Sequence, residues 1–261
     1  MSLDKNTGAK RAREARADLG FTREGPLPDV VVAIEEDGGA HVVVLKLPAG
    51  VAGAYVARTD CPLLFVNGHQ ALTRQRFTVA HEFGHHRMGH ASVVDDQQAI
   101  SGKLHDPQEV RANAFAAEFL MPRDAIAAWG LEHVRGAVTL EHVLRLAYEY
   151  GVSAQAARYA LQSAGVLSDA GRCRQLDEEI VSSMRVALGQ HLGLQYPRDE
   201  LADAAGRLPR IPSALRNSAL GDLLAGVIDS EQLALQLGRD QNEVVTMLAE
   251  LGIDELRSAA S

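Results

Sequence analysis

The fold and the chemistry of this chain depend on the stretch Arg76-Phe77-Thr78-Val79-Ala80-His81-Glu82-Phe83-Gly84-His85-His86. Within it, His81, Glu82 and His85 form the pattern HExxH. An α-helix has about 3.6 residues per turn, so residues four apart point to the same side. His81 and His85 can therefore bind one metal ion, with Glu82 beside the water molecule that the ion activates.

This spacing suits hydrolytic zinc chemistry. Two neutral imidazoles from one helix face and a third ligand from elsewhere leave one tetrahedral position for water, whose pKa the metal lowers to about 7. Glu82 is then the general base, which takes a proton from this water as the oxygen attacks a peptide carbonyl. It later returns the proton to the leaving amine.

HExxH has only three fixed residues, so a helix with two surface histidines and a solvated glutamate is the alternative interpretation. The apolar stripe of this helix includes both histidines, because its members are Phe77, Ala80, His81, Gly84, His85 and Met88. Two histidines on an inward face carry a desolvation cost, which a metal ion or buried hydrogen bonds must offset. The pattern therefore favours a metal site.

A third ligand is expected on a second helix, which begins with Asp106 as N-cap and Pro107 at the first helical position. Glu109 shares a helix face with Asn113, whereas Glu118 lies about half a turn round from it. Glu109 is the candidate ligand, and Asn113 would orient it. The alternative is that Glu109 only closes a capping box at this helix start.

The first motif, followed by Glu109-Val110-Arg111-Ala112-Asn113-Ala114-Phe115-Ala116-Ala117-Glu118-Phe119-Leu120-Met121-Pro122, closely resembles the ImmA/IrrE-type metallopeptidases. The resemblance covers about residues 40–125 and, more loosely, continues to about 167. It implies that His81, His85 and Glu109 bind Zn2+ and that Glu82 is catalytic. It also implies a protein substrate, because members of this family typically cleave a helix-turn-helix repressor. A His, His, Glu site also binds Mn2+ or Fe2+, so the sequence leaves the metal open.

A rival zinc class, the metzincins, is excluded by two positions. Its longer pattern requires glycine at 88 and histidine at 91, where this chain has Met88 and Ala91. We expect Gly89 to end the active-site helix. We expect His86 and His90 to face solvent or to lie behind the ligands.

Composition narrows the class of protein. With 261 residues and 46% hydrophobic content, the chain can bury a sizeable core and divides into two or three units. A net charge of -8 gives no global sign of a nucleic-acid binder. Two distant cysteines, Cys61 and Cys173, fit a reducing cytoplasm. No apolar run reaches the length of about 18 residues typical of a membrane span, and we expect a cytoplasmic protein. The oligomeric state is left open.

Residues 1–130 are expected to form an α+β, zincin-like catalytic domain. It is predicted to begin with a helix over 9–19 that Gly20 ends, followed by strands over 30–34, 41–47, 54–58 and 63–66 with a hairpin turn at 37–39. The active-site helix, capped by Thr73, comes next, and a polar loop over 91–105 that includes His105 leads to the second helix. A short helix through Trp129, stopped by Gly130, closes the domain. Strand 54–58 is expected at the sheet edge, where it would pair with an extended substrate.

The remaining chain is predicted to be all-α. Residues 131–170 form a helix-turn-helix-like unit: Thr139 caps a helix over 140–150, Gly151 ends it, and Ser153 caps a helix over 154–163. Three arginines (Arg135, Arg145, Arg158) against four acids (Glu132, Glu141, Glu149, Asp169) disfavour DNA contact, although the shape allows it.

Residues 171–261 form a C-terminal helical domain with expected helices over 175–188, 201–208, 214–224, 230–237 and 241–251. Ser230 is expected to cap the fourth of these and Gly252 to stop the last. From 210 to 261 there are four arginines and eight acids, which disfavours phosphate binding. Its apolar residues are expected to build a core or a docking surface: Leu220, Leu223, Leu224, Val227, Leu233 and Leu237.

These observations support a zinc-dependent endopeptidase that makes a limited cut in a protein partner, expected to be a transcriptional repressor. Two alternatives remain open. In the first, the chain is a transcriptional regulator whose tandem helix-turn-helix units act on DNA and whose metal site is structural. In the second, the metal site is a sensor that gates partner binding without proteolysis.

Overall fold

The computed structural model of the chain describes residues 2–21, 25–27, 29–37, 39–48, 50–58, 62–96, 106–194, 210, 212, 219–237 and 240–250. Its strands are β1 (His41–Leu45), β2 (Val51–Val56), β3 (Leu63–Asn67) and β4 (Val93–Asp96). Its helices are α1 (Leu3–Asp18), α2 (Val30–Asp37), α3 (Leu72–Arg87), α5 (Pro107–Leu120), α6 (Arg123–His133), α7 (Leu140–Tyr150), α8 (Ala154–Ser163), α9 (Ala170–Val181), α10 (Ser183–His191), α12 (Ala219–Leu224), α13 (Ser230–Leu237) and α14 (Gln241–Glu250). The predicted α+β class with a largely helical C-terminal region is confirmed.

In the part of the chain that the structure describes, the sheet has four strands in the order β1-β3-β2-β4. β1 and β3 are parallel, whereas β2 runs antiparallel to both β3 and β4. Every residue of β3 is buried, as expected for a strand that is covered on both faces. The predicted edge strand at 54–58 is therefore wrong, because β2 occupies most of it and has a neighbour on each side. Among the described strands, β1 and β4 lie at the two edges, and Val44 of β1 also forms an isolated bridge with Arg210.

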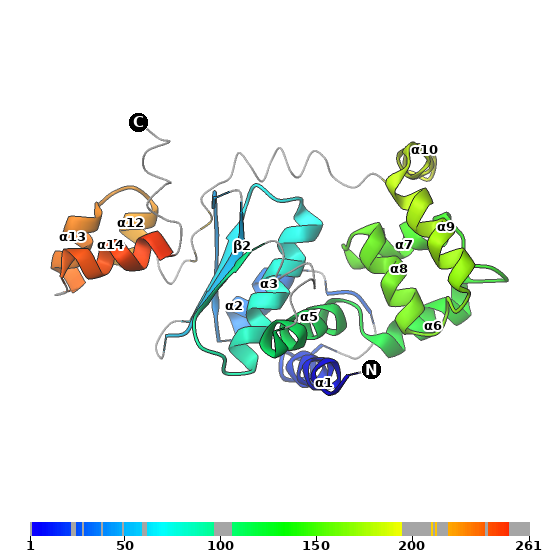
Figure 1. Cartoon of the computed structure of the whole chain (residues 1–261), viewed down its shortest axis with the longest axis horizontal. Helices are drawn as coiled ribbons and strands as arrows, with labels where there is room; N and C mark the ends of the chain where they lie inside the picture. The colour runs from blue at the N-terminus through cyan, green and yellow to red at the C-terminus, as the bar shows by residue number, and fades with distance from the viewer. Residues whose placement is uncertain are drawn as a thin grey trace.

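Successive residues of a strand point to opposite faces, and here each face meets a different set of helices. On one face, Val42 and Leu64 belong to a core that also contains Val79 of α3 and Phe115 of α5. On the other face, β-sheet residues meet residues of α12–α14 in a second core: Val43, Leu45, Phe65, Leu223, Leu233, Val244 and Leu248. Figure 1 shows α3 and α12–α14 on opposite sides of the sheet.

The first core continues from the sheet into helices α6–α9. It joins α1, α3 and α5 to α6–α9 through Ala12, Phe83, Phe115, Trp129, Leu146, Leu161 and Leu176. The helix-turn-helix prediction is confirmed in its details. α7 begins after Thr139 and ends at Gly151 (φ 61°), and the Ser153 side chain accepts a hydrogen bond from the Ala156 amide at the start of α8.

The predicted strand over 30–34 is wrong, because these residues form helix α2. The carboxylate of Asp29 accepts hydrogen bonds from the amides of Val31 and Val32, which caps a helix start. Val30, Ala33 and Ile34 are buried, and their spacing is that of a helix face. β-branched composition suggests a strand, but the period of the buried positions is helical. The hairpin predicted at 37–39 is wrong as well, because α2 and not a strand precedes it.

Four other boundaries differ from the predictions. α1 begins at Leu3, because Ser2 caps it. α6 runs past Gly130 to His133. The helix expected over 175–188 is two helices, α9 and α10, because Ser182 is extended and caps the second. The cap of α13 is the side chain of Asp229, which accepts a hydrogen bond from the Gln232 amide, and not Ser230.

Several predictions concern parts of the chain outside the described residues: Cys61, His105, the helix over 201–208, the start of the helix over 214–224, and Gly252. In the C-terminal set of apolar residues, Leu223 and Leu233 are core residues, whereas Val227 is exposed. Among the helices that the structure describes, none is both long enough and apolar enough to cross a membrane.

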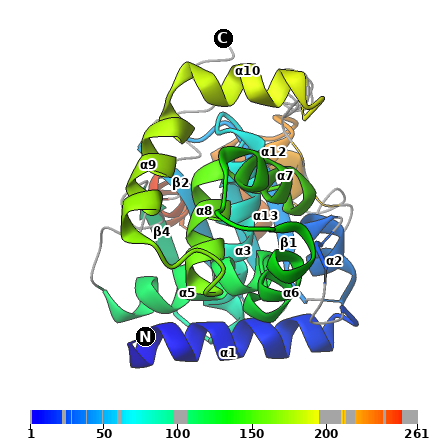
Figure 2. The ribbon, with the colours of Figure 1, turned by 90° about the vertical axis from the view of Figure 1, so that its right-hand side faces the viewer.

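Helix α1 lies beneath α5, the helix that carries Glu109 (Figure 2). Arg16 of α1 is buried and donates hydrogen bonds to the carbonyls of Phe119 (2.7 Å) and Gly25 (2.9 Å). Phe119 lies in the last turn of α5, where carbonyl groups lack helical partners. Burial lowers the pKa of the Arg16 guanidinium, and Tyr150 and Glu118 act in the opposite direction. Arg16 therefore attaches α1 to the end of α5.

We expect Arg16→Met to reduce the free energy of unfolding by about 2–3 kcal/mol, because buried carbonyls lose hydrogen bonds to a charged donor. Urea unfolding monitored by circular dichroism measures this. The matched control is Arg11→Met on the same helix, whose exposed ion pair with Glu14 contributes at most about 1 kcal/mol. Equal unfolding midpoints for the two variants would show that Arg16 has no such role.

Candidate metal centre

The HExxH stretch forms the C-terminal half of α3 and is completely buried. His81, Glu82 and His85 each have an exposed fraction of 0%. The surface-histidine alternative is therefore excluded. The helix starts after Ala71 without a side-chain cap, so the prediction that Thr73 caps it is wrong. It ends as expected, at Met88 followed by Gly89 with φ 68°.

Helix α5 begins as predicted, with the Asp106 carboxylate accepting a hydrogen bond from the Gln108 amide and with Pro107 in the first turn. It packs closely against α3 because Gly84 has no side chain. A Cβ atom at this position would lie 3.1 Å from the Phe115 ring. The close approach brings the Glu109 carboxylate to 3.2 Å from His81 Nε2 and 3.5 Å from His85 Nε2.

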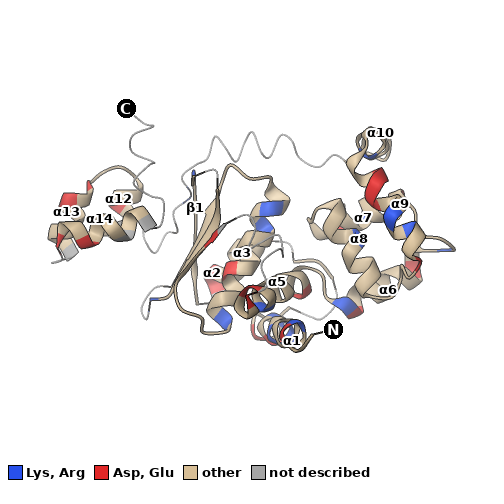
Figure 3. Cartoon of the chain, viewed as in Figure 1, with Lys and Arg blue, Asp and Glu red and all other residues tan. Residues whose placement is uncertain are grey.

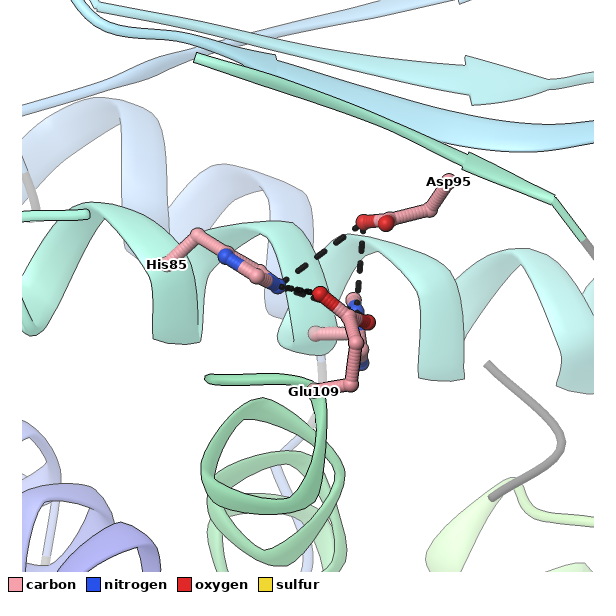
Figure 4. Close-up of side chains that lie close together, drawn as sticks. His85, Asp95 and Glu109 are labelled. Atoms are coloured by element: carbon pink, nitrogen blue, oxygen red, sulfur yellow. Dashed lines mark hydrogen bonds and ion pairs between the residues drawn. The ribbon is translucent and has the colours of Figure 1, made fainter. Parts of the chain in front are cut away.

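A fourth side chain, Asp95 of β4, joins these three. Its Oδ2 atom lies 3.3 Å from His81 Nε2 and 3.8 Å from His85 Nε2, and its side chain is 2% exposed. Figure 4 shows Asp95 reaching the cluster from the sheet, while Glu109 reaches it from α5 and His85 from α3. One ligand atom from each of His81, His85, Asp95 and Glu109 lies within 4.8 Å of the others.

The spacing of these atoms fits a tetrahedral metal ion. Bonds of about 2.0–2.1 Å place the ligands of such an ion about 3.3–3.4 Å apart. Here the two histidine Nε2 atoms are 3.1 Å apart, and the histidine-to-carboxylate distances range from 3.2 to 3.8 Å. Asp95 Oδ2 and Glu109 Oε2 are buried and face the imidazole nitrogen of His81 at these distances. Buried carboxylate oxygens are costly unless a proton or a cation compensates their charge. The residues therefore fit a metal ion.

The charges of the cluster also favour a cation. Burial, followed by the charge of His81, lowers the pKa of His85 to about 3, which keeps its imidazole neutral and able to bind metal. Burial also acts to lower the pKa of His81, but hydrogen bonds and charge from Asp95 and Glu109 outweigh it and the net direction is upward. Burial and the neighbouring Asp95 and Glu109 carboxylates raise the pKa of Glu82 well above its usual range. A divalent cation would offset this concentration of buried negative charge.

The general-base candidate Glu82 lies directly beneath β2. A Cβ atom on Gly53 would lie 2.5 Å from Glu82 Oε1 and 2.8 Å from the Phe65 carbonyl oxygen. Because the second contact is with backbone, this close approach requires glycine. Gly53 therefore leaves room for the Glu82 carboxylate between the sheet and α3.

We expect Gly53→Ala to reduce the free energy of unfolding by about 1–3 kcal/mol, the usual cost of overpacking, and to reduce metal-dependent activity by displacing Glu82. The matched control is Gly50→Ala, because a Cβ atom there meets nothing within 4 Å. Thermal unfolding of both variants measures the difference. Unchanged stability of Gly53→Ala would contradict the close packing around Glu82.

The other candidate residues lie around the cluster without belonging to it. His90 Nδ1 is 3.0 Å from His85 Nδ1, on the ring nitrogen that faces away from the cluster. His86 Nδ1 contacts the Tyr55 hydroxyl at 3.3 Å. Glu118 pairs with Arg13 of α1 at 2.9 Å and points away from the cluster. Asn113 is half-buried on α5, and its orienting role stays a prediction.

Sequence reasoning missed Asp95, because residues 91–105 were expected to be a polar loop. The adjacent Val93 and Val94 are the signal of a short strand at this place. β4 has only four residues, and Ser92 Oγ accepts a hydrogen bond from the Ala57 amide just before it. Asp95 lies opposite Gly53 in the antiparallel pairing of β4 with β2.

The geometry agrees with a comparison of the sequence with protein-family models. Residues 36–162 match the model of the IrrE N-terminal-like domain, a family of peptidases. The matched segment contains the whole sheet and every member of the cluster. No curated protein matches the chain.

Proposed function

Residues 36–162 belong to the ImmA/IrrE metallopeptidase family, and from this premise we propose that the chain is a metal-dependent endopeptidase that makes a limited cut in a protein partner. The observation that supports it best is the buried meeting of HExxH with Glu109. A chance HExxH sequence on a surface helix would not bring two imidazoles and carboxylates together inside the core at the spacing of metal ligands.

In this proposal His81, His85 and Glu109 hold the ion. A bound zinc ion lowers the pKa of water and polarises the scissile carbonyl. Glu82 accepts the proton of the attacking water and donates it to the leaving amine. Burial excludes bulk water around Glu82, and His90 fixes the ring of His85 from behind.

The proposed place for an extended substrate is β4. Within the described residues β4 has a neighbouring strand only on its β2 side. An edge strand offers free main-chain groups, to which a peptide can add as a further strand. β4 also carries Asp95, so a peptide on this edge lies next to the cluster. This replaces the strand at 54–58 as the candidate.

The proposed partner is a transcriptional repressor with a helix-turn-helix, as the family resemblance implies. The helical modules α7–α10 carry exposed large apolar side chains that suit protein contact: Tyr148, Tyr159, Val181, Met184 and Val186. These modules lie on the far side of α5 from the sheet (Figure 1).

DNA binding by the same modules is the weaker candidate. Arg158 of α8 is buried and makes two hydrogen bonds to the Asp177 carboxylate, at 2.8 and 3.0 Å, so it cannot reach a phosphate. The described parts of α12–α14 contain no Lys or Arg, and Figure 3 shows only acidic colouring among their charges. Phosphate contacts need a cluster of cations.

The proposal is tested by identifying new protein N-termini by mass spectrometry after zinc-loaded protein acts on a native lysate of the source cells. We expect one or a few cut sites, concentrated in a helix-turn-helix protein, and none when a chelator is present. A gel shift with upstream DNA tests whether the helical modules bind DNA. We expect no shift, and therefore none of the salt-dependent binding that phosphate contacts produce. DNA binding without any chelator-sensitive cut would favour the regulator instead.

A further inference from the structure

Asp95 lies on the metal side of both histidine rings. Residues that support a metal-binding histidine from behind contact its other ring nitrogen, as His90 does at Nδ1 of His85. Asp95 Oδ2 instead faces the Nε2 atoms of His81 and His85, the same atoms that face Glu109. Its position is that of a ligand.

The backbone of β4 directs Asp95 inward. Val94 is 42% exposed, whereas Asp95, the next residue, is 2% exposed, as expected from the alternation of a strand. The pairing of β2 with β4 shifts register between Val51 and Gly53, which is opposite Asp95. Such an irregularity changes the direction of side chains and is common next to active sites.

Counting Asp95, the cluster offers a metal ion four protein ligands. A tetrahedral zinc site with four protein ligands is closed, whereas a catalytic site has three protein ligands and keeps one position open for water or substrate. Asp95 Oδ2 lies 3.3 and 3.8 Å from the two Nε2 atoms, which are 3.1 Å apart, and the Glu109 oxygens Oε2 and Oε1 lie 3.2 and 3.5 Å from them. Asp95 therefore stands at a similar spacing from both histidines as Glu109 does, close to the spacing of about 3.3–3.4 Å between ligands of one tetrahedral zinc ion.

We propose that Asp95 is a fourth protein ligand and that this structure is the closed state of the site. The Asp95 carboxylate takes the position that water and the scissile carbonyl need, so the site opens only when Asp95 leaves it. β4 is suited to such a movement, because within the described residues only β2 pairs with it. A peptide that adds to the free edge of β4 contacts the strand that holds Asp95.

The inference rests on metal binding at this site, which the proposed function also requires, but it does not rest on proteolysis. It is tested on full-length protein loaded with Co2+, whose visible absorption reports the number and type of its ligands. Azide is the probe, because this anion binds Co2+ at an open coordination position. The proteins compared are wild type, Asp95→Ala, Asp95→Asn and the control Asp124→Ala, which removes an exposed carboxylate from α6.

We expect wild type and Asp124→Ala to bind one Co2+ with a spectrum that azide does not change. We expect Asp95→Ala to bind Co2+ more than about tenfold more weakly, since even residues that only support a ligand contribute about 10–100-fold. Its spectrum should change on azide addition, and that of Asp95→Asn should change in the same direction.

A change in the wild-type Co2+ spectrum on azide addition would overturn the closed state, and this result does not depend on the folding of any variant. Unchanged Co2+ affinity in Asp95→Ala would overturn the ligand role. If wild type binds Co2+ with an open position, only this inference fails. If wild type binds no Co2+ at all, the proposed function fails with it.

Discussion

Glu82→Gln should abolish proteolytic cleavage while leaving the metal bound. Glutamine keeps the shape of the side chain but cannot accept a proton, and general-base catalysis contributes about 10²–10⁴-fold to a rate. Glu82 is not one of the four residues whose donor atoms converge, so the metal content should stay that of wild type. The measurement is the rate at which the new N-terminus of the identified substrate appears, together with metal content.

The matched control is Glu118→Gln, the same change in a glutamate of α5 that pairs with Arg13. This partly exposed ion pair contributes at most about 1 kcal/mol, so cleavage should persist. Cleavage at the wild-type rate by Glu82→Gln would refute the assignment of the general base. Loss of both cleavage and metal would show instead that Glu82 is needed to form the site.

Removing the metal should destabilise the fold strongly, because two histidines and two carboxylates would stay buried without a cation. A ligand at about 1,000 times its dissociation constant stabilises the native state by about 4 kcal/mol. For a chain of this size that corresponds to a rise in Tm of about 8–16 °C. Thermal unfolding of chelator-treated protein, before and after zinc is added back, measures the shift.

The comparison protein for this experiment is Glu109→Ala, which lacks one ligand of the cluster. Its zinc-induced shift should be much smaller than that of wild type at the same zinc concentration. Glu118→Ala should keep the full shift, because its side chain points to α1. Equal shifts in wild type and Glu109→Ala would mean that zinc stabilises the protein from some other site.

Elements with strong local signals could be predicted from the sequence. The helix-turn-helix over α7 and α8 matches residue by residue, because Thr139, Gly151 and Ser153 mark its ends through their own side-chain or backbone preferences. Asp106 and Pro107 mark the start of α5 in the same way. The two helix faces then carry His81, His85 and Glu109 toward one place.

Features that depend on distant parts of the chain could not be predicted. The order β1-β3-β2-β4 places β2 inside the sheet, and nothing near Ala54 in the sequence indicates this. Four of the five residues 30–34 are β-branched, yet Asp29 and the core select a helix. Asp95 becomes part of the site only because the four-residue strand β4 pairs with β2, and the helix spacing that relates His81 to His85 carries no information about a residue on an edge strand.

The central claim is that His81, His85 and Glu109 hold a metal ion in the buried cluster. The most direct test is the metal content of wild type, Glu109→Ala and Glu118→Ala, measured by mass spectrometry on protein purified without added metal. We predict about one metal ion per chain in wild type and in Glu118→Ala, and far less in Glu109→Ala. Wild-type protein that contains no metal, even after zinc is supplied, would contradict the claim and leave the chain as a binding protein.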